Sequence, residues 1–424
     1  MKLSRRQTIG VLFGLLGAYL VGFVATSLET ADKALKFEPP KLGDTSQLSL
    51  VFNPPVAVTA IGTIFVLAGI ATFFERRWER LARGALLLAA LCFIPLVIVL
   101  ALALSEASST NVVQLLVESL RLGTPIALGA MAGLWCERSG VVNIGIEGMM
   151  LTAAGTGFMT YAVLGDASGA PILWLSVGVA VLSGGLIASL HALLCVTFRV
   201  DQIISGVVIN LLALGLTGFI RSEVIVPTGV AIGTPTPDIA LPGLSQLPIL
   251  GDQLFTAQPI FFAMFVIVAV TSVVLFRTSF GLRVRSVGEN PHAAETLGID
   301  VIRIRYRAVI IGGLVAGLGG AWFSLEAQAG FEANMTNGTG FIALAALIFG
   351  KWRPSTAFAG AMLFGFTRAL QSRLQILKVS LGDFAIPSEF WQSLPYVVTI
   401  IVVAGAVGRA TAPAADGVPY ERSR

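Results

Sequence analysis

The sequence is poor in charge. Only 12% of its 424 residues are charged, whereas 55% are hydrophobic. Soluble globular proteins carry about 25% charged residues, so a single water-soluble domain is excluded. Intrinsic disorder is excluded as well, because it requires low hydrophobicity and high net charge. The formal net charge of +4 is too small to indicate nucleic-acid binding.

Side chains that carry catalysis or bind metals are also scarce. The three cysteines and two histidines lack the spacing of a disulfide framework or a zinc site, and GxSxG, HExxH and CxxC are absent. The Gly350–Lys351 pair has Ala345 where a phosphate-binding loop needs its first glycine. We therefore expect no enzyme activity, metal or cofactor on this chain. His191 lies among small and apolar residues and is expected to be packed and hydrogen-bonded.

What the sequence has in abundance is long apolar stretches. About 20 apolar residues span a bilayer as a helix, and helices satisfy their own backbone hydrogen bonds in lipid. The sequence predicts an all-α, polytopic transmembrane bundle of about twelve segments, of which 338–350 is unusually short. The stretches are 8–27, 56–74, 84–104, 112–135, 141–164, 172–197, 203–220, 259–276, 308–329, 338–350, 355–371 and 394–408.

Lysine and arginine indicate the orientation of these segments. They cluster before the first stretch, between the second and third, after the sixth, between the eighth and ninth, and after the tenth. All of these loops fall on one side if every segment crosses, and short basic loops stay in the cytoplasm. We therefore predict that both termini are cytoplasmic.

The composition changes near residue 108. Residues 1–107 hold three plain hydrophobic segments and are interpreted as an accessory membrane region. Residues 108–410, whose segments contain Glu, Asn, Arg and many glycines, are interpreted as the functional core. Residues 411–424 are expected to form a flexible cytoplasmic tail.

The first unusual motif is ERSGVVNIGIEGMM, from Glu137 to Met150. It places Asn143 and Glu147 four residues apart, on one face if the segment is helical. A carboxylate is costly in lipid, so Glu147 should face the bundle or a wet cavity. Both side chains are candidates to line a pathway. The alternative is a tightly packed helix pair with Glu147 in a structural hydrogen bond.

The second motif lies in the polar loop between Arg277 and Arg307. Here GENPHAAETLGID predicts a short helix, with Asn290 as cap, Pro291 at the first position and Gly298 in the left-handed conformation that ends it. Such a short helix is marginal alone. It should dock on a partner or, alternatively, on the cytoplasmic face of its own protein.

The third motif, FEANMTNGTG, supplies Asn334, Asn337 and Thr339 and leads into the short apolar segment. It is either a re-entrant or discontinuous element or an exposed loop that caps a short helix. In the first case its three polar side chains are further candidates for the pathway.

Together these motifs resemble the permease family of ABC importers for branched-chain amino acids, simple sugars and nucleosides. ERSGVVNIGIEGMM, VGENPHAAETLGID and TGFIALAALIFGKWRP occur in the family's order, and the resemblance covers residues 110–405. The second motif and GFIALAALIFGKW most resemble the shorter, Q-type permease of nucleoside importers. Thr339 stands where a basic residue is expected in nucleoside permeases.

The resemblance implies a bacterial plasma-membrane importer whose functions are carried by separate subunits. A separate ATPase binds ATP and Mg²⁺, a substrate-binding lipoprotein delivers the ligand, and two permeases, expected to be different chains, form the pathway. The helix with Asn290, Pro291, Ala293, Ala294 and Gly298 would be the coupling helix that meets the ATPase. Two alternatives remain: a permease for sugars or branched-chain amino acids, and an ion-coupled carrier with Glu147 and Glu326 as proton sites.

Overall fold

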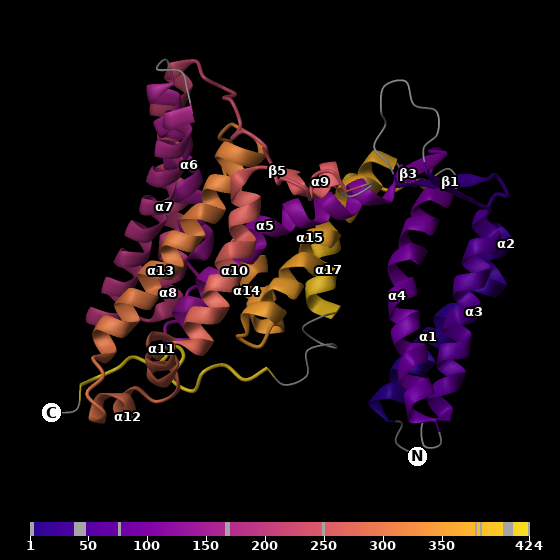
Figure 1. Cartoon of the computed structure of the whole chain (residues 1–424), viewed down its shortest axis with the longest axis horizontal. Coiled ribbons are helices and arrows are strands. Elements are labelled where there is room, and N and C mark those ends of the chain that lie inside the picture. Colours follow the sequence, from indigo (N-terminus) through magenta and orange to yellow (C-terminus); the bar gives the residue numbers. More distant parts are fainter. Residues whose placement is uncertain are drawn as a thin grey trace. The chain divides into compact units, whose positions relative to one another are not determined.

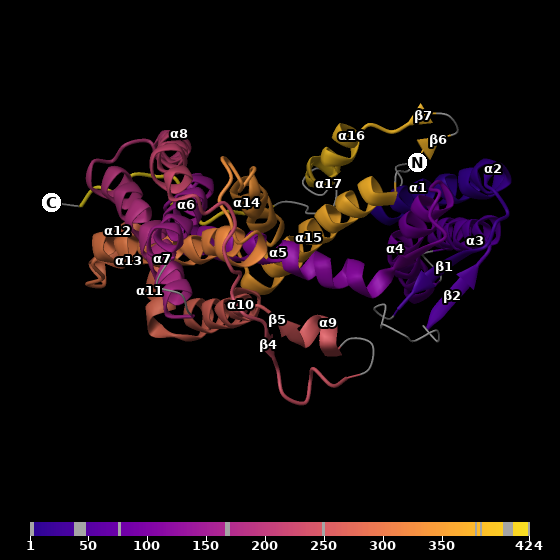
Figure 2. The ribbon, with the colours of Figure 1, turned by 90° about the horizontal axis from the view of Figure 1, so that it is seen from above.

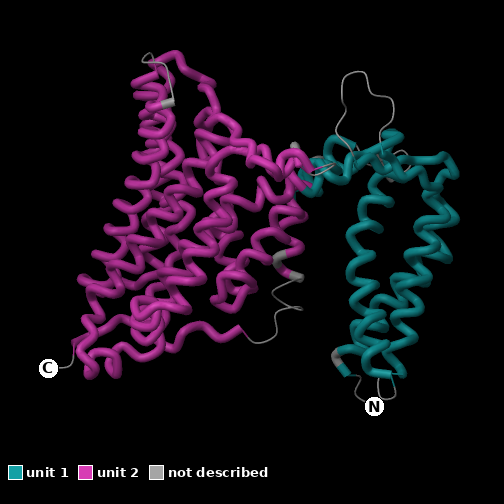
Figure 3. The backbone as a smooth tube through the Cα atoms, in the orientation of Figure 1, with its two compact units in different colours: residues 1–116, 370–393 teal, residues 117–369, 394–424 magenta. Residues whose placement is uncertain are grey.

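A computed structural model of the chain describes residues 4–37, 48–74, 78–165, 170–247, 251–377, 380–381, 384–401 and 410–422. The chain divides into two compact units (Figure 3). One consists of Met1–Leu116 with Leu370–Ser393, and the other of Val117–Ala369 with Leu394–Arg424. Helices α5 (Val112–Glu137) and α15 (Pro354–Leu377) each contribute residues to both units.

Three long helices form most of the first unit. They are α1 (Arg5–Tyr19), which continues through a π turn (Leu20–Val24) into α2 (Ala25–Ser27), then α3 (Pro54–Phe73) and α4 (Glu79–Ala103). Glycines let α1 and α3 approach closely, because a Cβ on Gly69 would lie 2.7 Å from the carbonyl oxygen of Gly10. Short elements complete the unit: β6 (Ser380–Leu381), β7 (Phe384–Ala385) and α16 (Ser388–Gln392).

A small sheet joins the ends of these helices. β1 (Lys33–Lys36) pairs antiparallel with β2 (Ser49–Phe52) and parallel with β3 (Ser109–Asn111). The Lys33 ammonium donates to the carbonyl oxygens of Ser105 and Ala107, both at 2.9 Å. Strand β3 leads directly into α5.

The second unit is a bundle in which α6, α7, α8 and α13 pack together (Figures 1 and 2). Gly313 and Gly317 on α13 meet Gly184 on α7, where a Cβ would lie 2.6 Å from the α13 backbone. The bundle helices are α6 (Ile146–Leu164), α7 (Ala170–Ala192) with a π turn (Leu193–Thr197), α8 (Gln202–Ile220) with a π turn (Arg221–Ile225), α10 (Pro259–Arg277), and α13 (Val301–Ala321) with a π turn (Trp322–Ala327).

Shorter elements lie between and after these helices. They are a 3₁₀ turn (Val226–Thr228), β4 (Ile239–Ala240), α9 (Gly251–Phe255), β5 (Thr256–Ala257), α11 (Ser279–Glu289), α12 (Pro291–Thr296), α14 (Thr339–Phe349) and α17 (Leu394–Ile401). Strands β4 and β5 pair antiparallel. The segment after α17 is described again from residue 410.

Eight helices of the described residues are long and apolar enough to cross a membrane. The prediction of a polytopic helical membrane protein is therefore confirmed, and the described residues include a helix at each of the twelve predicted stretches. Residues 402–408 of the last stretch lie outside the described residues. α14 has eleven residues. Its length of about 16 Å is half of the hydrocarbon thickness, so it does not span.

The loop predicted between Arg277 and Arg307 is largely helical. The Thr278 hydroxyl accepts the backbone N–H of Gly281 at 3.2 Å and starts α11, which the sequence had not indicated. α12 follows, and α13 already begins at Val301. Together with residues 410–422, α11 and α12 lie at one end of the bundle (Figure 1).

Candidate functional site

Glu147 lies in the first turn of α6 and is buried. Its Oε1 accepts the Thr336 hydroxyl at 2.6 Å and the Gly338 N–H at 2.8 Å, and its Oε2 accepts the Gly340 N–H at 2.6 Å. Gly338 and Gly340 belong to the N-terminus of α14, whose unpaired N–H groups and dipole favour a negative charge. Glu147 is therefore a cap that joins α6 to α14.

The loop before α14 holds the other three pathway candidates. Asn334 and Asn337 have left-handed φ values of 57° and 41°, which asparagine tolerates better than most residues. Their side chains are exposed, whereas Thr339 is buried and its hydroxyl donates to the Thr336 carbonyl oxygen. Glu147 and Thr339 are thus both buried and both bonded to Thr336, while Asn334 and Asn337 remain on the surface of this site.

Asn143 does not share a helix face with Glu147, and that prediction is wrong. α6 begins only at Ile146, so Asn143 lies in a non-helical linker of residues 138–145. Gly140 has a φ of 84°, which ends the helical path after α5. The buried Asn143 amide donates to sulfur atoms, Sγ of Cys136 at 3.3 Å and Sδ of Met149 at 3.5 Å.

His191 holds this linker in place from α7. Its Nε2 lies 3.0 Å from the Val142 carbonyl oxygen and its Nδ1 lies 2.9 Å from the Ser205 hydroxyl. Because a carbonyl can only accept, Nε2 carries the proton and Nδ1 accepts from Ser205. The predicted packed, hydrogen-bonded role of His191 is confirmed.

Two further polar side chains cap helices inside the bundle. Asn210 on α8 accepts the Gly148 N–H at 2.8 Å and donates to the Ile144 carbonyl oxygen at 3.1 Å. The Glu326 carboxylate accepts the N–H groups of Ile260 and Phe261 at 2.7 and 3.1 Å, at the start of α10. The sequence offered Glu326 only as a proton site of an ion-coupled carrier, and it contained no signal for these distant partners.

The three motifs that carry the family resemblance meet at the C-terminal end of α5. Glu137 accepts the indole N–H of Trp352, and Arg138 donates to the Trp352 carbonyl oxygen at 2.6 and 2.9 Å. Arg138 also lies 3.8 Å from the Glu289 carboxylate at the end of α11. The folded chain therefore joins ERSG, GKW and VGEN at one place, although they are far apart in the sequence.

The predicted short helix is confirmed as α12. Asn290 accepts the Ala293 N–H at 3.0 Å, Pro291 is the first helical residue, and Gly298 has a left-handed φ of 79°. The five named residues do not share one environment. Pro291 and Ala294 are buried against the protein, whereas Ala293 is exposed.

A groove of about 750 Å³ lies beside α12, between α11 and the start of α13. It is lined by the apolar side chains of Leu282 and Leu297, of which Leu297 is 81% exposed. Three exposed arginines share the lining: Arg283, Arg303 and Arg307. An exposed apolar side chain among cations is suited to a partner with an apolar pocket and an acidic rim.

Comparisons of the sequence with known proteins show the family to which this chain belongs. Residues 115–403 match the model of the family described as branched-chain amino acid transport system / permease component. The chain is 40% identical over 313 residues to the guanosine ABC transporter permease protein NupQ of Bacillus subtilis, covering 72% of this chain and 96% of that protein. No solved structure matches the chain.

Two other relatives are similar over nearly their whole length. The nucleoside ABC transporter permease protein NupC of Lactococcus lactis is 39% identical over 74% of this chain and 99% of its own. The putative glucose ABC transporter permease protein TsgC13 of Haloferax volcanii is 36% identical over 70% of this chain and 92% of its own. The chain is a multi-pass membrane protein and belongs to the ABC permease family of branched-chain amino acid transport systems.

Proposed function

We propose that the chain is the permease subunit of an ABC importer for nucleosides in a bacterial plasma membrane. The observation that carries the substrate class is the likeness to two permeases whose names state guanosine and nucleosides, at 40% and 39% identity. Neutral donors and acceptors such as Asn143, Asn334, Asn337 and Thr339 suit sugar hydroxyls and base edges. Glu147 supports this site by fixing the loop that carries three of them.

α12 would be the coupling helix. Its exposed face, the adjacent groove and the exposed arginines form a docking surface for a cytoplasmic ATPase, which would bind ATP and Mg²⁺. A second permease and a substrate-binding lipoprotein would complete the importer. The chain is 27% identical over 259 residues to NupP, named as another guanosine ABC transporter permease protein of B. subtilis, which is consistent with a pair of different permeases.

The topology that fits this function has about twelve membrane segments with both termini in the cytoplasm. Residues 1–107 would be an accessory membrane region, 108–410 the permease core and 411–424 a cytoplasmic tail. Arg138, Arg199 and Arg353 then lie at the α12 end of the second unit, in keeping with the positive-inside rule.

A permease for sugars is the second candidate, because the Haloferax relative is named as a putative glucose permease. Branched-chain amino acids are the third, from the family's description. An ion-coupled carrier is disfavoured by the two glutamates that it would need. Both Glu147 and Glu326 accept backbone N–H bonds at helix N-termini, an arrangement that gives each carboxylate a structural capping role.

The test is transport by the assembled complex. The chain, its partner permease, ATPase and binding protein are reconstituted in proteoliposomes, and uptake of labelled guanosine, glucose and leucine is compared. We expect ATP-dependent guanosine uptake that unlabelled nucleosides compete away. Uptake of glucose or leucine alone would overturn the substrate class, and uptake by this chain alone under a proton gradient would overturn the importer.

A further inference from the structure

The C-terminal segment, residues 410–422, is rich in Ala, Pro and Gly, and such composition is typical of a flexible tail. The structure instead places it along the α12 end of the second unit (Figure 1). The Ala415 N–H donates to the Gly288 carbonyl oxygen at 2.9 Å and the Ala414 N–H to the Glu289 carboxylate at 3.2 Å. These bonds attach the segment to the end of α11, directly before the α12 cap.

A buried cation explains why the segment stays there. Arg305 on α13 is 1% exposed, and an uncompensated charge at such a position is costly. The segment supplies the Val418 carbonyl oxygen at 3.1 Å and the Tyr420 ring with its centroid 5.9 Å from the guanidinium carbon. Removing the segment would leave Arg305 without these groups.

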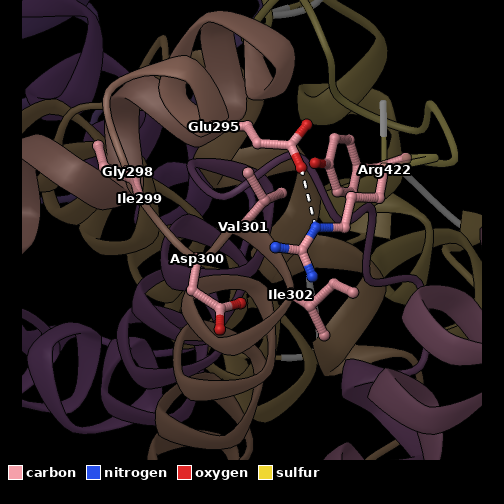
Figure 4. A pocket seen from close by; sticks show the side chains of 8 residues that line it. Glu295, Gly298, Ile299, Asp300, Val301, Ile302 and Arg422 are labelled. Atoms are coloured by element: carbon pink, nitrogen blue, oxygen red, sulfur yellow. Dashed lines mark hydrogen bonds and ion pairs between the residues drawn. The ribbon is translucent and has the colours of Figure 1, made fainter. Parts of the chain in front are cut away.

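The segment also contacts α12 itself. The rings of Tyr420 and His292 have centroids 5.3 Å apart, and the Arg422 guanidinium lies 3.2 Å from the Glu295 carboxylate. Figure 4 shows the Arg422–Glu295 pair at the side of a cavity of about 290 Å³ between the segment, α12 and the start of α13. The helix is therefore held from one side by the bundle, through Pro291 and Ala294, and from another by the segment.

The exposed side chains of both elements are available to a partner. On α12 these are His292 and Ala293, Leu297 follows directly after the helix, and on the segment Val418 is 51% exposed. Leu297 lines the groove that the proposed function assigns to the ATPase, and Tyr420 lines the cavity. The groove and the cavity share the lining residues Gly298, Ile299 and Asp300. The docking surface is thus continuous from α11 to the end of the segment.

We propose that residues 410–422 belong to the ATPase-docking surface: they fasten α12 to the membrane core and present, together with it, one composite face to the ATPase. This inference rests on the proposed function, because it takes the ATPase as the partner of α12. The segment acts by positioning α12, and Tyr420 is the residue on which most of its contacts with α12 and α13 converge.

The first experiment compares Tyr420→Ala with Tyr420→Phe in the full complex. Loss of the ring removes the contacts with His292 and Arg305, so we expect Tyr420→Ala to weaken ATPase binding at least tenfold. Tyr420→Phe keeps the ring and should stay within threefold of the parent. Association with the partner permease reports folding of the membrane core and should be unchanged in both variants.

A charge exchange tests the pair seen in Figure 4. Ion pairs at the surface contribute little free energy, so Arg422→Glu or Glu295→Arg should each weaken ATPase binding by only about two- to fivefold. The double variant restores the pair and should recover most of the loss. Losses that simply multiply in the double variant would show that the pair does not position α12.

Amide hydrogen exchange tests whether residues 410–422 contact the ATPase or only hold α12 in place. Adding the ATPase to the complex of the two permeases should slow amide exchange in residues 417–422 and in α12, and leave residues 221–247 unchanged. If the ATPase binds but exchange in 417–422 is unaltered and Tyr420→Ala binds normally, this inference fails while the proposed function stands. If the parent complex binds no ATPase, both fail.

Discussion

The carboxylate of Glu147 accepts the backbone N–H of Gly340 at 2.6 Å, across 193 residues of sequence. The helices that carry them approach so closely that a Cβ on Gly340 would lie 2.5 Å from the Glu147 nitrogen and 2.6 Å from its Cα. The absent side chain is therefore what allows the cap to form. This contact fixes the loop with Asn334, Asn337 and Thr339 against the start of α6.

Gly340→Ala should separate α6 from α14. Real Cβ atoms do not approach backbone this closely, so one helix must shift, at a cost of about 1–3 kcal/mol. We expect a lower Tm of the purified protein in detergent. Gly218→Ala on α8 is the matched control, because a Cβ there meets no atom within 4 Å. Equal Tm values for the two variants would contradict the close contact.

Glu147→Ala should destabilise the protein more than Glu147→Gln. The alanine leaves the hydroxyl of Thr336 and two backbone N–H groups without their acceptor, and each buried unsatisfied donor costs about 1–3 kcal/mol. Glutamine keeps one acceptor oxygen. Thermal unfolding should therefore rank parent, Gln and Ala in falling order. Glu332→Gln, at an exposed ion pair with Arg221, should change Tm little, and a similar loss there would argue against a special role of Glu147.

Ala294→Pro should release the ATPase without harming membrane insertion. The Ala294 N–H bonds the Asn290 carbonyl oxygen at 3.0 Å, and proline removes this bond from a buried position of a six-residue helix. Co-purification of the ATPase and ligand-stimulated ATP turnover measure the effect. Thr296→Ala, on the exposed face, keeps the backbone bonds of α12 and serves as control. Normal turnover in Ala294→Pro would refute the assignment of α12 as the coupling helix.

Docking of the C-terminal segment should depend on pH through Asp416. Burial raises the pKa of its carboxyl from 3.8 to about 7, although the Arg305 guanidinium opposes the shift. Glu137 and Cys136 on α5 face the same carboxyl. Because the docked form has the higher pKa, docking takes up a proton. It should be strongest below pH 3.8, weaken as the pH rises to about 7, and then stay constant.

The anisotropy of a fluorophore on Val418→Cys reports this docking, since Val418 is exposed. Anisotropy should fall as the pH rises through the stated range. Asp416→Asn cannot ionise and should flatten the curve. A slope that persists in Asp416→Asn would assign the pH dependence to another group.

The sequence predicted correctly those features that depend on residues close together in the chain. The apolar stretches located the helices, because burial in lipid needs only a run of apolar residues. The cap, first residue and end of α12 followed from Asn290, Pro291 and Gly298, because their conformational preferences act within a few residues. The same reasoning failed for Asn143, since the positive φ of Gly140 breaks the helix that the four-residue spacing assumed.

The sequence by itself determined the membrane class, the positions of the helices and the family, since these depend on composition, short-range preference and motif order. Only the tertiary structure decided the partners of the polar side chains. Glu147 finds Gly340, Trp352 finds Glu137, and the C-terminal segment covers Arg305. Each pairing follows from the cost of leaving a charge or a hydrogen-bonding group unsatisfied in a packed interior, and the group that meets this cost lies 113 to 215 residues away.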